Sequence, residues 1–393
     1  MEGLPVRWRQ QKEQREIYIK EVDMGSYGVF RFAVKRIAVL VAVSSLPATV
    51  WAQSSVTLYG VLDAGLIYTT KSYNPATGQN GGKQFEMISS GLEPSVFGLS
   101  GQEDLGGGMR IKFKLESGIS LANGGFDNTN GGLFGRQAWI SLASNVGEFK
   151  AGLQFSPFIL ALYDSDPRSM AQFGSNISVY ANNTFTGTFV SNAVSYTSPK
   201  IVGFTASLMY ALGGVPGDFN AGRQYSASLK YEGAGLLVNA AVYDASAGNE
   251  TSLNNTLFEV PLIAKTFGLG YTISSFTVKA SYTNYKAPMT TLNGLVGGGD
   301  HDVWNLGFNY FVTPALNVNS GVWYLRDPHD SSTHGLLFAL GTQYSLSKRT
   351  SLYAQVGVTD NHGRSTLGLD VDGAMQGAPG TTVGGGVGIL HRF

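Results

Sequence analysis

Residues 55–68 read Ser-Val-Thr-Leu-Tyr-Gly-Val-Leu-Asp-Ala-Gly-Leu-Ile-Tyr, and this stretch decides the fold class. Apolar or small residues occupy every second position from Val56 to Tyr68, while the positions between them include Thr57 and Asp63. Because successive side chains of a β-strand point to opposite faces, the pattern predicts one long strand with an apolar face.

The same alternation recurs around residues 110–116, 276–283, 304–310 and 352–358. Charged residues make up 14% of the 393 residues, whereas an average soluble chain has about a quarter. Long alternating strands with so few charges would give a soluble protein a polar interior or an apolar exterior. A barrel in a membrane has no such conflict and leaves no strand edge unpaired. The sequence therefore predicts an all-β fold, a transmembrane antiparallel β-barrel.

Short and long connections alternate along the chain, as periplasmic turns and extracellular loops do in such barrels. The short ones are expected at 103–108, 144–147, 198–200, 232–235, 274–275, 313–315 and 345–349. The long ones are expected around 69–93, 117–133, 156–190, 213–223, 246–259, 287–301, 326–333 and 359–380. Eight long connections between paired strands predict about sixteen strands.

The N-terminal region has the features of a targeting segment. Basic residues precede the apolar run 37–43, and small residues lead to a cleavage site after Ala52, which is typical of a secretory signal peptide. The apolar run is too short to span a membrane as a helix. We therefore interpret 1–23 as an upstream extension, 24–52 as the signal peptide and 53–393 as the barrel.

Composition and motifs exclude several other classes. The chain has no Cys, which removes disulfides and thiolate metal sites, and its formal net charge of zero argues against nucleic-acid binding. The triple glycine 106–108 lacks the Lys-Ser/Thr of a phosphate-binding loop and is interpreted as a tight turn. No pair among the five His has ligand spacing, no calcium-loop pattern occurs, and no His lies in a catalytic motif. The sequence predicts no metal, no cofactor and no enzymatic activity.

Several stretches spread over the mature chain resemble the Gram-negative general porins, specifically the Burkholderia- and Neisseria-like branch. They are 55–65, 101–108, 133–138, 192–199, 346–353 and the terminal His391-Arg392-Phe393. The resemblance implies a homotrimer in the outer-membrane bilayer that passes ions and small hydrophilic solutes by passive diffusion. It also implies a third loop folded into a sixteen-stranded barrel, and a terminal Phe393 that forms part of the signal for the outer-membrane assembly machinery.

The loop from 156 to 188 matches the family's constriction loop in position and length. The resemblance implies that its acidic residues, Asp164 and Asp166, face a cationic wall, and Arg136 lies in the family's wall-arginine motif. Polar-face residues of the predicted strands complete the expected pore constriction: Asp63, Lys112, Lys114 and Glu116.

The chain departs from the family at three positions that commonly hold wall arginines. Val96, Leu153 and Phe189 stand there, so the usual arginine ladder and its strong anion selectivity are not expected. The alternatives are a substrate-selective channel, a barrel enzyme such as a lipase or protease, and a purely structural or adhesive barrel. A barrel of eight strands is filled by side chains whereas sixteen strands leave an aqueous channel, so single-channel conductance separates the last alternative from a pore.

Overall fold

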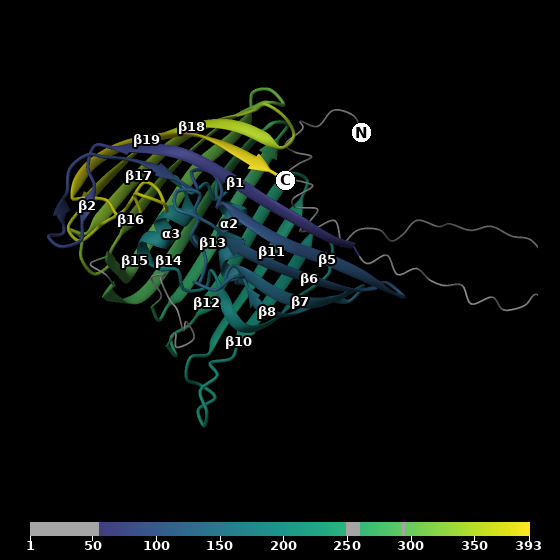
Figure 1. Cartoon of the computed structure of the whole chain (residues 1–393). Coiled ribbons are helices and arrows are strands. Elements are labelled where there is room, and N and C mark those ends of the chain that lie inside the picture. The colour runs from purple at the N-terminus through teal and green to yellow at the C-terminus, as the bar shows by residue number, and fades with distance from the viewer. Residues whose placement is uncertain (1–54, 249–259, 293–294) are drawn as a thin grey trace, which may run out of the picture.

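The computed structural model describes residues 55–248, 260–292 and 295–393 (Figure 1). Sixteen antiparallel strands pair with their neighbours in chain order and close into a barrel, which confirms the predicted fold class. The predicted extension and signal peptide, and most of the loop expected at 246–259, lie outside the described residues.

The first half of the wall consists of β1 (Ser55–Thr69), β4 (Gln84–Ile88), β5 (Val96–Gly106), β6 (Met109–Gly118), β7 (Gln137–Ser144), β8 (Gly147–Gln154), β9 (Val190–Thr197), β10 (Phe204–Ala211) and β11 (Gln224–Gly233). The second half consists of β12 (Leu236–Asp244), β13 (Ile263–Ile273), β14 (Phe276–Leu292), β15 (Leu295–Phe311), β16 (Leu316–Arg326), β17 (His334–Ser345), β18 (Thr350–His362) and β19 (Gly380–Arg392). A small hairpin of β2 (Tyr73–Asn74) and β3 (Gln79–Asn80) lies outside the wall sheet.

The barrel closes through β1, which has a different neighbour on each edge. One edge pairs with β19, from Val61 opposite Arg392 to Thr69 opposite Gly384. The other edge pairs first with β5 and then with β4. β4 and β5 therefore act as one wall strand that is interrupted at residues 89–95.

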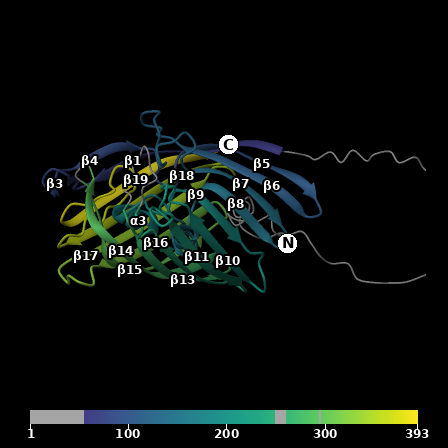
Figure 2. The ribbon, with the colours of Figure 1, turned by 90° about the horizontal axis from the view of Figure 1, so that it is seen from below.

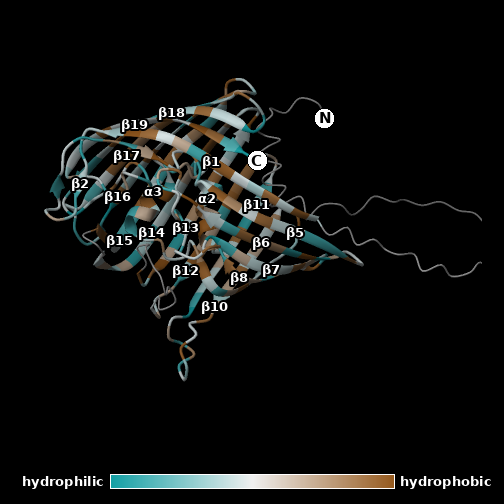
Figure 3. Cartoon of the chain, in the orientation of Figure 1, coloured by the Kyte–Doolittle hydropathy of each residue, from teal (hydrophilic) through white to brown (hydrophobic). Residues whose placement is uncertain are grey.

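Side chains alternate between the outer face and the lumen as the sequence predicts. On β1, Leu66 and Tyr68 are exposed on the outside, whereas Asp63 and Ile67 point inward and are buried. Figure 3 shows this alternation as brown and teal bands along the strands. The exposed residues are mostly apolar, so the outer face suits lipid and the inner face suits water.

The connections at one end of the barrel, the turn end, are short. Gly107 and Gly108 join β5 to β6 with φ of +62° and +81°, a left-handed conformation that favours glycine. The interpretation of 106–108 as a tight turn is thereby confirmed. The connections at the opposite end, the loop end, are long.

Two of the expected long connections contain more regular structure than predicted. The segment 287–301 continues as paired strand from β14 to Leu292 and from Leu295 into β15, with a register shift between Ala287 and Thr290. The segment 69–93 contains β2, β3 and β4. Both segments extend the pairing of adjacent strands, which the local composition of Gly, Asn and Thr does not indicate.

The third long connection, residues 155–189 (L3), folds into the barrel as the resemblance implied. It carries two short helices that the sequence did not predict, α2 (Pro157–Ser165) and α3 (Asn176–Asn183). Figure 1 shows both helices within the ring of strands, and Figure 2 shows α3 there from below; α2 packs against β10 to β14 and α3 against β15. No helix within the described ranges is long and apolar enough to cross a membrane.

The last long connection, residues 363–379 (L8), also turns inward. Phe173 of L3 forms an isolated antiparallel bridge with Asp370 of L8, and Gly174 donates a backbone hydrogen bond to Leu369. Leu367 and Leu369 are buried in the same hydrophobic cluster as the two helices. The main apolar core therefore lies inside the barrel, between L3, L8 and the wall.

Candidate functional site

Helix α2 fixes one side of L3 to the wall. Ser156 caps it by accepting a hydrogen bond from the N–H of Ile159 at 3.2 Å, and Pro157 starts its first turn, a position where the missing N–H costs nothing. Phe158 is fully buried, with its ring centroid 6.3 Å from that of Tyr243 and 6.4 Å from that of Tyr285. Burying a side chain of this size stabilises the contact by about 1.5–3 kcal/mol.

The wall has space for α2 because small residues line it. An added Cβ at Gly268 of β13 would lie 2.4 Å from the Cβ of Ser165, which is closer than real side chains approach. Ala211, Ala241 and Ala264 of the neighbouring strands are buried in the same cluster. The close approach fixes α2 in position and leaves its other side facing the open lumen.

That other side of α2 carries the charge of the loop. Leu160 and Tyr163 are exposed there, and the Oδ2 atom of Asp164 lies 3.1 Å from the Nζ atom of Lys230 on β11. Both charged side chains keep some exposure, 16% for Asp164 and 22% for Lys230. An ion pair with this geometry presents both signs of charge to the lumen.

Asp166, the other acidic residue predicted at the constriction, is fully buried and faces the interior of L3. Its Oδ1 atom accepts a hydrogen bond from the N–H of Arg168 at 2.6 Å, and its Oδ2 atom accepts one from the N–H of Asn176. Its carbonyl oxygen accepts one from Lys279 Nζ at 2.9 Å. Asp166 thus shapes the turn between α2 and α3, which is a structural position.

Arg168 fastens the tip of L3 to the opposite wall. The guanidinium donates to Asn319 Oδ1 of β16 at 2.8 Å, to Gln355 Oε1 of β18 at 2.6 Å and to the carbonyl oxygen of Phe173 at 2.7 Å. All of these acceptors are neutral, and the side chain is buried. L3 therefore spans the lumen from β11–β14 to β16–β18.

Arg136, the predicted wall arginine, lies where L3 leaves and rejoins the wall. Its Nε atom donates to Glu116 Oε1 at 3.0 Å, and its guanidinium lies over the rings of Phe155 and Phe189, 5.7 Å and 5.4 Å from their centroids. These rings belong to the first residue of L3 and to its last. Arg136 is thus paired with Glu116, and Asp164 with Lys230, so these contacts do not bring Arg136 and Asp164 together.

The Glu116 carboxylate accepts hydrogen bonds from several side chains on the lumen side of β6. Its Oε2 atom accepts hydrogen bonds from Lys114 at 3.0 Å and from Tyr59 at 2.8 Å, in addition to the pairing of Oε1 with Arg136. Lys112 lies on the same face of β6, two residues before Lys114, and its Nζ atom is 3.5 Å from Glu148 Oε2. Three of the expected residues, Lys114, Glu116 and Arg136, thus form one connected network.

Asp63 stands in the wall and organises the break between β4 and β5. Its Oδ2 atom accepts hydrogen bonds from the N–H groups of Leu92 and Glu93 at 2.7 and 2.9 Å, and its Oδ1 atom accepts one from Tyr353 Oη at 2.6 Å. These donors satisfy a buried carboxylate. Its contacts hold the interrupted strand together.

The three apolar positions have different surroundings. Val96 is buried in a small cluster with Leu92 and with Ala171 of L3. Phe189 is the last residue of L3 and is buried against Phe155, the first, with ring centroids 5.8 Å apart. Leu153 lies at the register shift of β8, between Gly152 and Gln154. Two of the three, Val96 and Phe189, therefore contribute to the packing of L3.

Two groups of lumen residues that contact L3 were not predicted from the sequence. Lys230 and Lys279 contact L3 directly, yet they lie on strands far along the chain from it. The alternation of β11 was a usable signal, because Lys230 shares its face with the buried Ser226 and Gln224. L8 was the other omission, and its apolar residues at alternate positions, Leu367 and Leu369, were the available signal.

L8 also brings carboxylates into the interior. Burial raises the pKa of Asp370 well above its ordinary value of 3.8, and the nearby carboxylates of Asp372 and Asp63 act in the same direction. The Oδ2 atom of Asp370 has no hydrogen-bond partner among the described residues. Burial likewise raises the pKa of Asp372. The packing of L8 against L3 is therefore sensitive to protonation.

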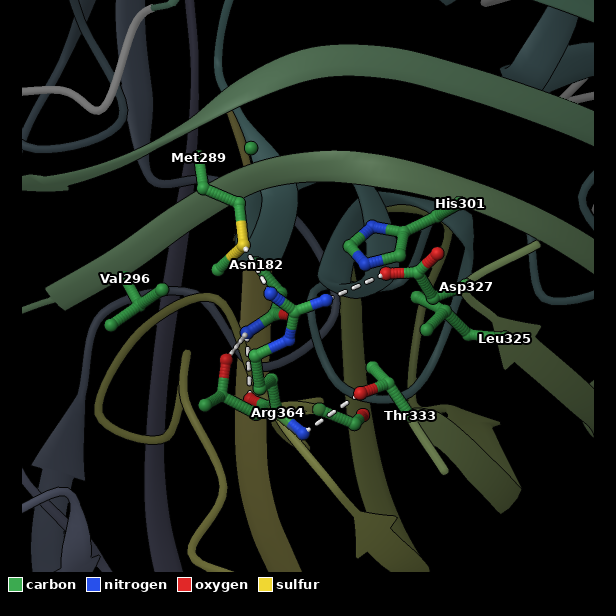
Figure 4. A pocket seen from close by; sticks show the side chains of 11 residues that line it. Asn182, Met289, Val296, His301, Leu325, Asp327, Thr333 and Arg364 are labelled. Atoms are coloured by element: carbon green, nitrogen blue, oxygen red, sulfur yellow. Dashed lines mark hydrogen bonds and ion pairs between the residues drawn. The ribbon is translucent and has the colours of Figure 1, made fainter. Parts of the chain in front are cut away.

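A pocket lies at the loop end, where L3, the β14–β15 hairpin, residues 327–333 and L8 meet (Figure 4). Arg364 of L8 occupies it, with Nη2 3.1 Å from Asp327 Oδ2 and its backbone N–H donating to Thr333 Oγ1 at 3.1 Å. Asn182 of α3 donates to the carbonyl oxygen of Thr366 at 2.7 Å. These contacts tie the long connections to one another above L3.

The C-terminal residue is part of the barrel closure. The backbone N–H of Phe393 donates to Gly60 O, and the N–H of Gly60 donates to Phe393 O, both at 3.1 Å. An added Cβ at Gly60 would lie within 2.6 Å of two atoms of the Phe393 ring. Gly60 thus provides the seat for the terminal ring, and Arg392 forms an ion pair with Glu93 beside it.

Comparisons with known proteins agree with this architecture. The model of a family described as Gram-negative porin matches residues 37–364. Outer membrane porin protein 32 of Delftia acidovorans is 27% identical over 379 residues, covering 92% of this chain and 100% of that relative. An outer membrane porin protein of Bordetella pertussis is 29% identical over 392 residues, covering 87% of this chain and 95% of the relative.

A solved structure shares the fold as well. The anion-selective porin from Comamonas acidovorans has a TM-score of 0.69 and 25% identity, over 87% of this chain and 100% of that one. The family match extends over more than half of the chain, and the relatives are porins of the outer membrane. The chain therefore belongs to the Gram-negative porins and forms a channel in the cell outer membrane.

Proposed function

We propose that this porin is a water-filled diffusion channel for ions and small hydrophilic solutes, in which L3 sets the narrowest section. The observation that carries the proposal is the position of α2, which is fixed to the β10–β14 wall and turns the Asp164–Lys230 pair toward the lumen. A barrel of sixteen strands leaves an aqueous channel, and a loop fixed inside it narrows that channel.

The charges near the constriction support weak ionic selectivity. Two cations near L3 have an acidic partner, since Lys230 pairs with Asp164 and Arg136 with Glu116, and on the neighbouring β8 Lys150 lies 4.3 Å from the centroid of the Trp139 ring. A solute therefore meets alternating signs of charge in place of one uniform field. We propose a milder preference than that of the anion-selective relative.

We assign the constriction to two groups of residues with different roles. Asp164, Lys112 and Lys114 are charged side chains of the lumen, and Arg136 with Glu116 joins the base of L3 to the wall. Asp63 and Asp166 act by positioning, because their carboxylates hold backbone N–H groups. Asp63 and Asp166 thus shape the opening. The other five residues set the electric field within it.

A substrate-selective channel is the second candidate, and the inward packing of L8 on L3 favours it. The bridge between Phe173 and Asp370 holds L8 against L3 inside the barrel, where it would occupy part of the entrance. A selective channel would show current block that saturates with one solute, whereas a general channel would admit solutes by size. The relatives are channels, and we propose a passive role without catalysis.

The proposal also covers the oligomeric state of the protein and its export to the outer membrane. The resemblance to the family and the apolar outer face support a homotrimer in the bilayer, reached by secretion with cleavage near Ala52. Phe393, seated on Gly60, is the residue that we propose the assembly machinery recognises.

Single-channel recording in a planar bilayer tests the proposal. The purified protein should open in ohmic steps, with three equal levels for a trimer, and liposomes that contain it should swell in small sugars faster than in large ones. A barrel that inserts without conductance would contradict the proposal. Saturable block by one sugar or amino acid, without block by others of equal size, would favour the selective candidate.

A further inference from the structure

A row of aromatic rings crosses five neighbouring strands near the loop end and finishes in two histidines. Ring centroids along it are 5.4 Å apart for Tyr282–Trp304, 6.0 Å for Trp304–Tyr324, 6.5 Å for Tyr324–His334 and 4.6 Å for His334–His362. The Tyr and Trp members are exposed on the outer face. Aromatic rings at such a level serve as membrane-interface anchors, a role that does not require imidazole.

The two histidines are direct partners in the β17–β18 pairing. His334 lies opposite His362 in the register, and their rings are nearly parallel, with an interplanar angle of 17°. Directly opposite residues of an antiparallel pair have Cβ atoms about 4.5–5.5 Å apart. The backbone of two strands thus holds two imidazoles side by side, although 27 residues separate them in the sequence. In the stacked arrangement their nitrogen lone pairs lie in two nearly parallel planes, so one ring must rotate about its side-chain bonds before both can bind the same ion.

The charges around the pair favour a bound cation. Asp360 lies two residues before His362 on the same face, with its Oδ2 atom 3.0 Å from His362 Nε2 and its Oδ1 atom accepting from Thr381 at 2.9 Å. A carboxylate that holds one ring nitrogen leaves the other free for a ligand and fixes the orientation of the ring.

The basic residue on the β16 side is held away from the pair. Arg326 lies opposite His334 on the β16 side, but its Nη2 atom is 3.3 Å from Asp302, and its guanidinium lies over the Trp304 ring, 5.1 Å from the centroid. On the other side, the β18–β19 pairing ends at Asn361 opposite Gly380, one residue before His362. The pair is therefore open to a ligand along that edge.

We propose that His334 and His362 bind a divalent transition-metal ion on the outer face of the barrel, with Asp360 orienting His362. Paired imidazoles select Cu²⁺, Zn²⁺ or Ni²⁺ over the oxygen-preferring Mg²⁺ and Ca²⁺. Within the described part of the chain, no group of three or more His, Cys, Asp or Glu side chains is already arranged for a metal. The site is thus a two-imidazole site whose remaining positions are filled by solvent.

Sequence spacing does not indicate this pair, because no two histidines have the spacing of a local metal motif. Only the hairpin register brings positions 334 and 362 together. The site is independent of the pore and of the proposed solute pathway, since both rings lie on the face that carries Leu336 and Val356, away from the lumen.

The test uses the untagged full chain, folded in detergent, with Cu²⁺ as the probe. Electron paramagnetic resonance should show one Cu²⁺ per chain with two nitrogen ligands, and chelator competition should give its affinity. His334→Gln and His362→Gln should each remove one nitrogen and weaken binding by at least roughly tenfold, and Asp360→Asn should weaken it by about 10–100-fold, as outer-shell changes do.

Two further variants keep the result decisive. His329→Gln removes an exposed imidazole that also lies beside a carboxylate, 3.1 Å from Asp300, and should leave Cu²⁺ binding unchanged. His334→Tyr preserves the aromatic row and should still lose binding, and heat-modifiable migration on gels checks that each variant has folded. Wild-type affinity in His334→Tyr and His362→Gln, or an equal loss in His329→Gln, would overturn the proposal.

Discussion

The Oδ2 atom of Asp164 lies 3.1 Å from the Nζ atom of Lys230, which joins the lumen side of helix α2 to strand β11. Each of the two charges offsets the other, so removing the charge of one residue leaves the charge of its partner without that offset. A unit charge about 4 Å from an ion changes its energy by about 1 kcal/mol in water, which alters permeability up to roughly fivefold.

Asp164→Asn should therefore shift the zero-current potential in a salt gradient toward anions, since Lys230 keeps its charge. Lys230→Gln is the mirror variant and should shift it toward cations. Both shifts should shrink as the salt concentration rises, because the Debye length falls to about 3 Å at 1 M. Reversal potentials in dilute KCl measure the effect, and shifts of the same sign in both variants would argue against a shared pair.

Arg136→Ala should move the reversal potential toward cations and increase the open-channel noise. The change removes a positive charge beside Glu116 and the cationic contact with Phe155 and Phe189 at the two ends of L3. Arg136→Lys retains the charge and should recover the potential more than the noise. An unchanged potential in Arg136→Ala would place this residue outside the constriction.

Phe308→Arg should impair assembly, whereas Asn309→Arg should be tolerated. Phe308 lies on the outer face, stacked on Phe276 with ring centroids 5.6 Å apart, and Asn309 lies on the lumen side, where it accepts a hydrogen bond from Asn317. An arginine on the lipid face costs about 2–4 kcal/mol at the midplane and about 0–1 kcal/mol near the interfaces, and Phe308 pairs with Val278 close to the turn end, so a partial loss of assembly is expected. The yield of heat-modifiable barrel compares the two variants, and equal damage would refute the assigned faces.

Asp370→Asn should raise the melting temperature at pH 7.5 and have little effect near pH 4. Because burial raises the pKa of Asp370 above 3.8, the packed L8 favours the protonated carboxyl. Its ionisation therefore disfavours the packed state progressively as the pH rises from 3.8 through the raised pKa. Asparagine keeps an acceptor for the Asp372 N–H and never ionises. A larger gain at pH 4 than at pH 7.5 would reverse this sign.

Deleting Phe393 should reduce the amount of trimer in the outer membrane while leaving export across the inner membrane normal. The deletion removes two backbone hydrogen bonds to Gly60 as well as the terminal ring. Phe393→Tyr retains the ring and the backbone and serves as the matched control. Wild-type levels of trimer from the deletion would show that the residue has no role in assembly.

The fold was predictable because its signal is local. The alternation of Val56, Leu58 and Leu66 with residues such as Asp63 is a property of one segment, and it repeats in each strand. The helices of L3 were not predictable in the same way, since α2 and α3 have nine and eight residues. Helices this short are marginal in isolation and depend on tertiary packing, here on Tyr243 and Tyr285.

The partners of the site residues were harder to predict than the residues themselves. Asp164 was expected opposite Arg136, but it forms an ion pair with Lys230, which belongs to a strand that the third loop reaches only after folding inward. Asp166 has the same charge and lies two residues away, yet it holds the N–H groups of Arg168 and Asn176. Sequence spacing cannot distinguish these two roles, because the distinction depends on which side of α2 the wall covers.

The pairing of Val61 with Arg392 joins the first strand of the barrel to the last. Each other pair of adjacent wall strands is consecutive in the sequence, so these pairs can form as hairpins while synthesis and export proceed. The β1–β19 pair can form only after β19 is present. Until it forms, β1 and β19 each expose a row of unpaired backbone groups that hydrocarbon does not tolerate. A chain truncated before β19 therefore cannot close the barrel, so a closed barrel in the membrane requires β1 and β19 together.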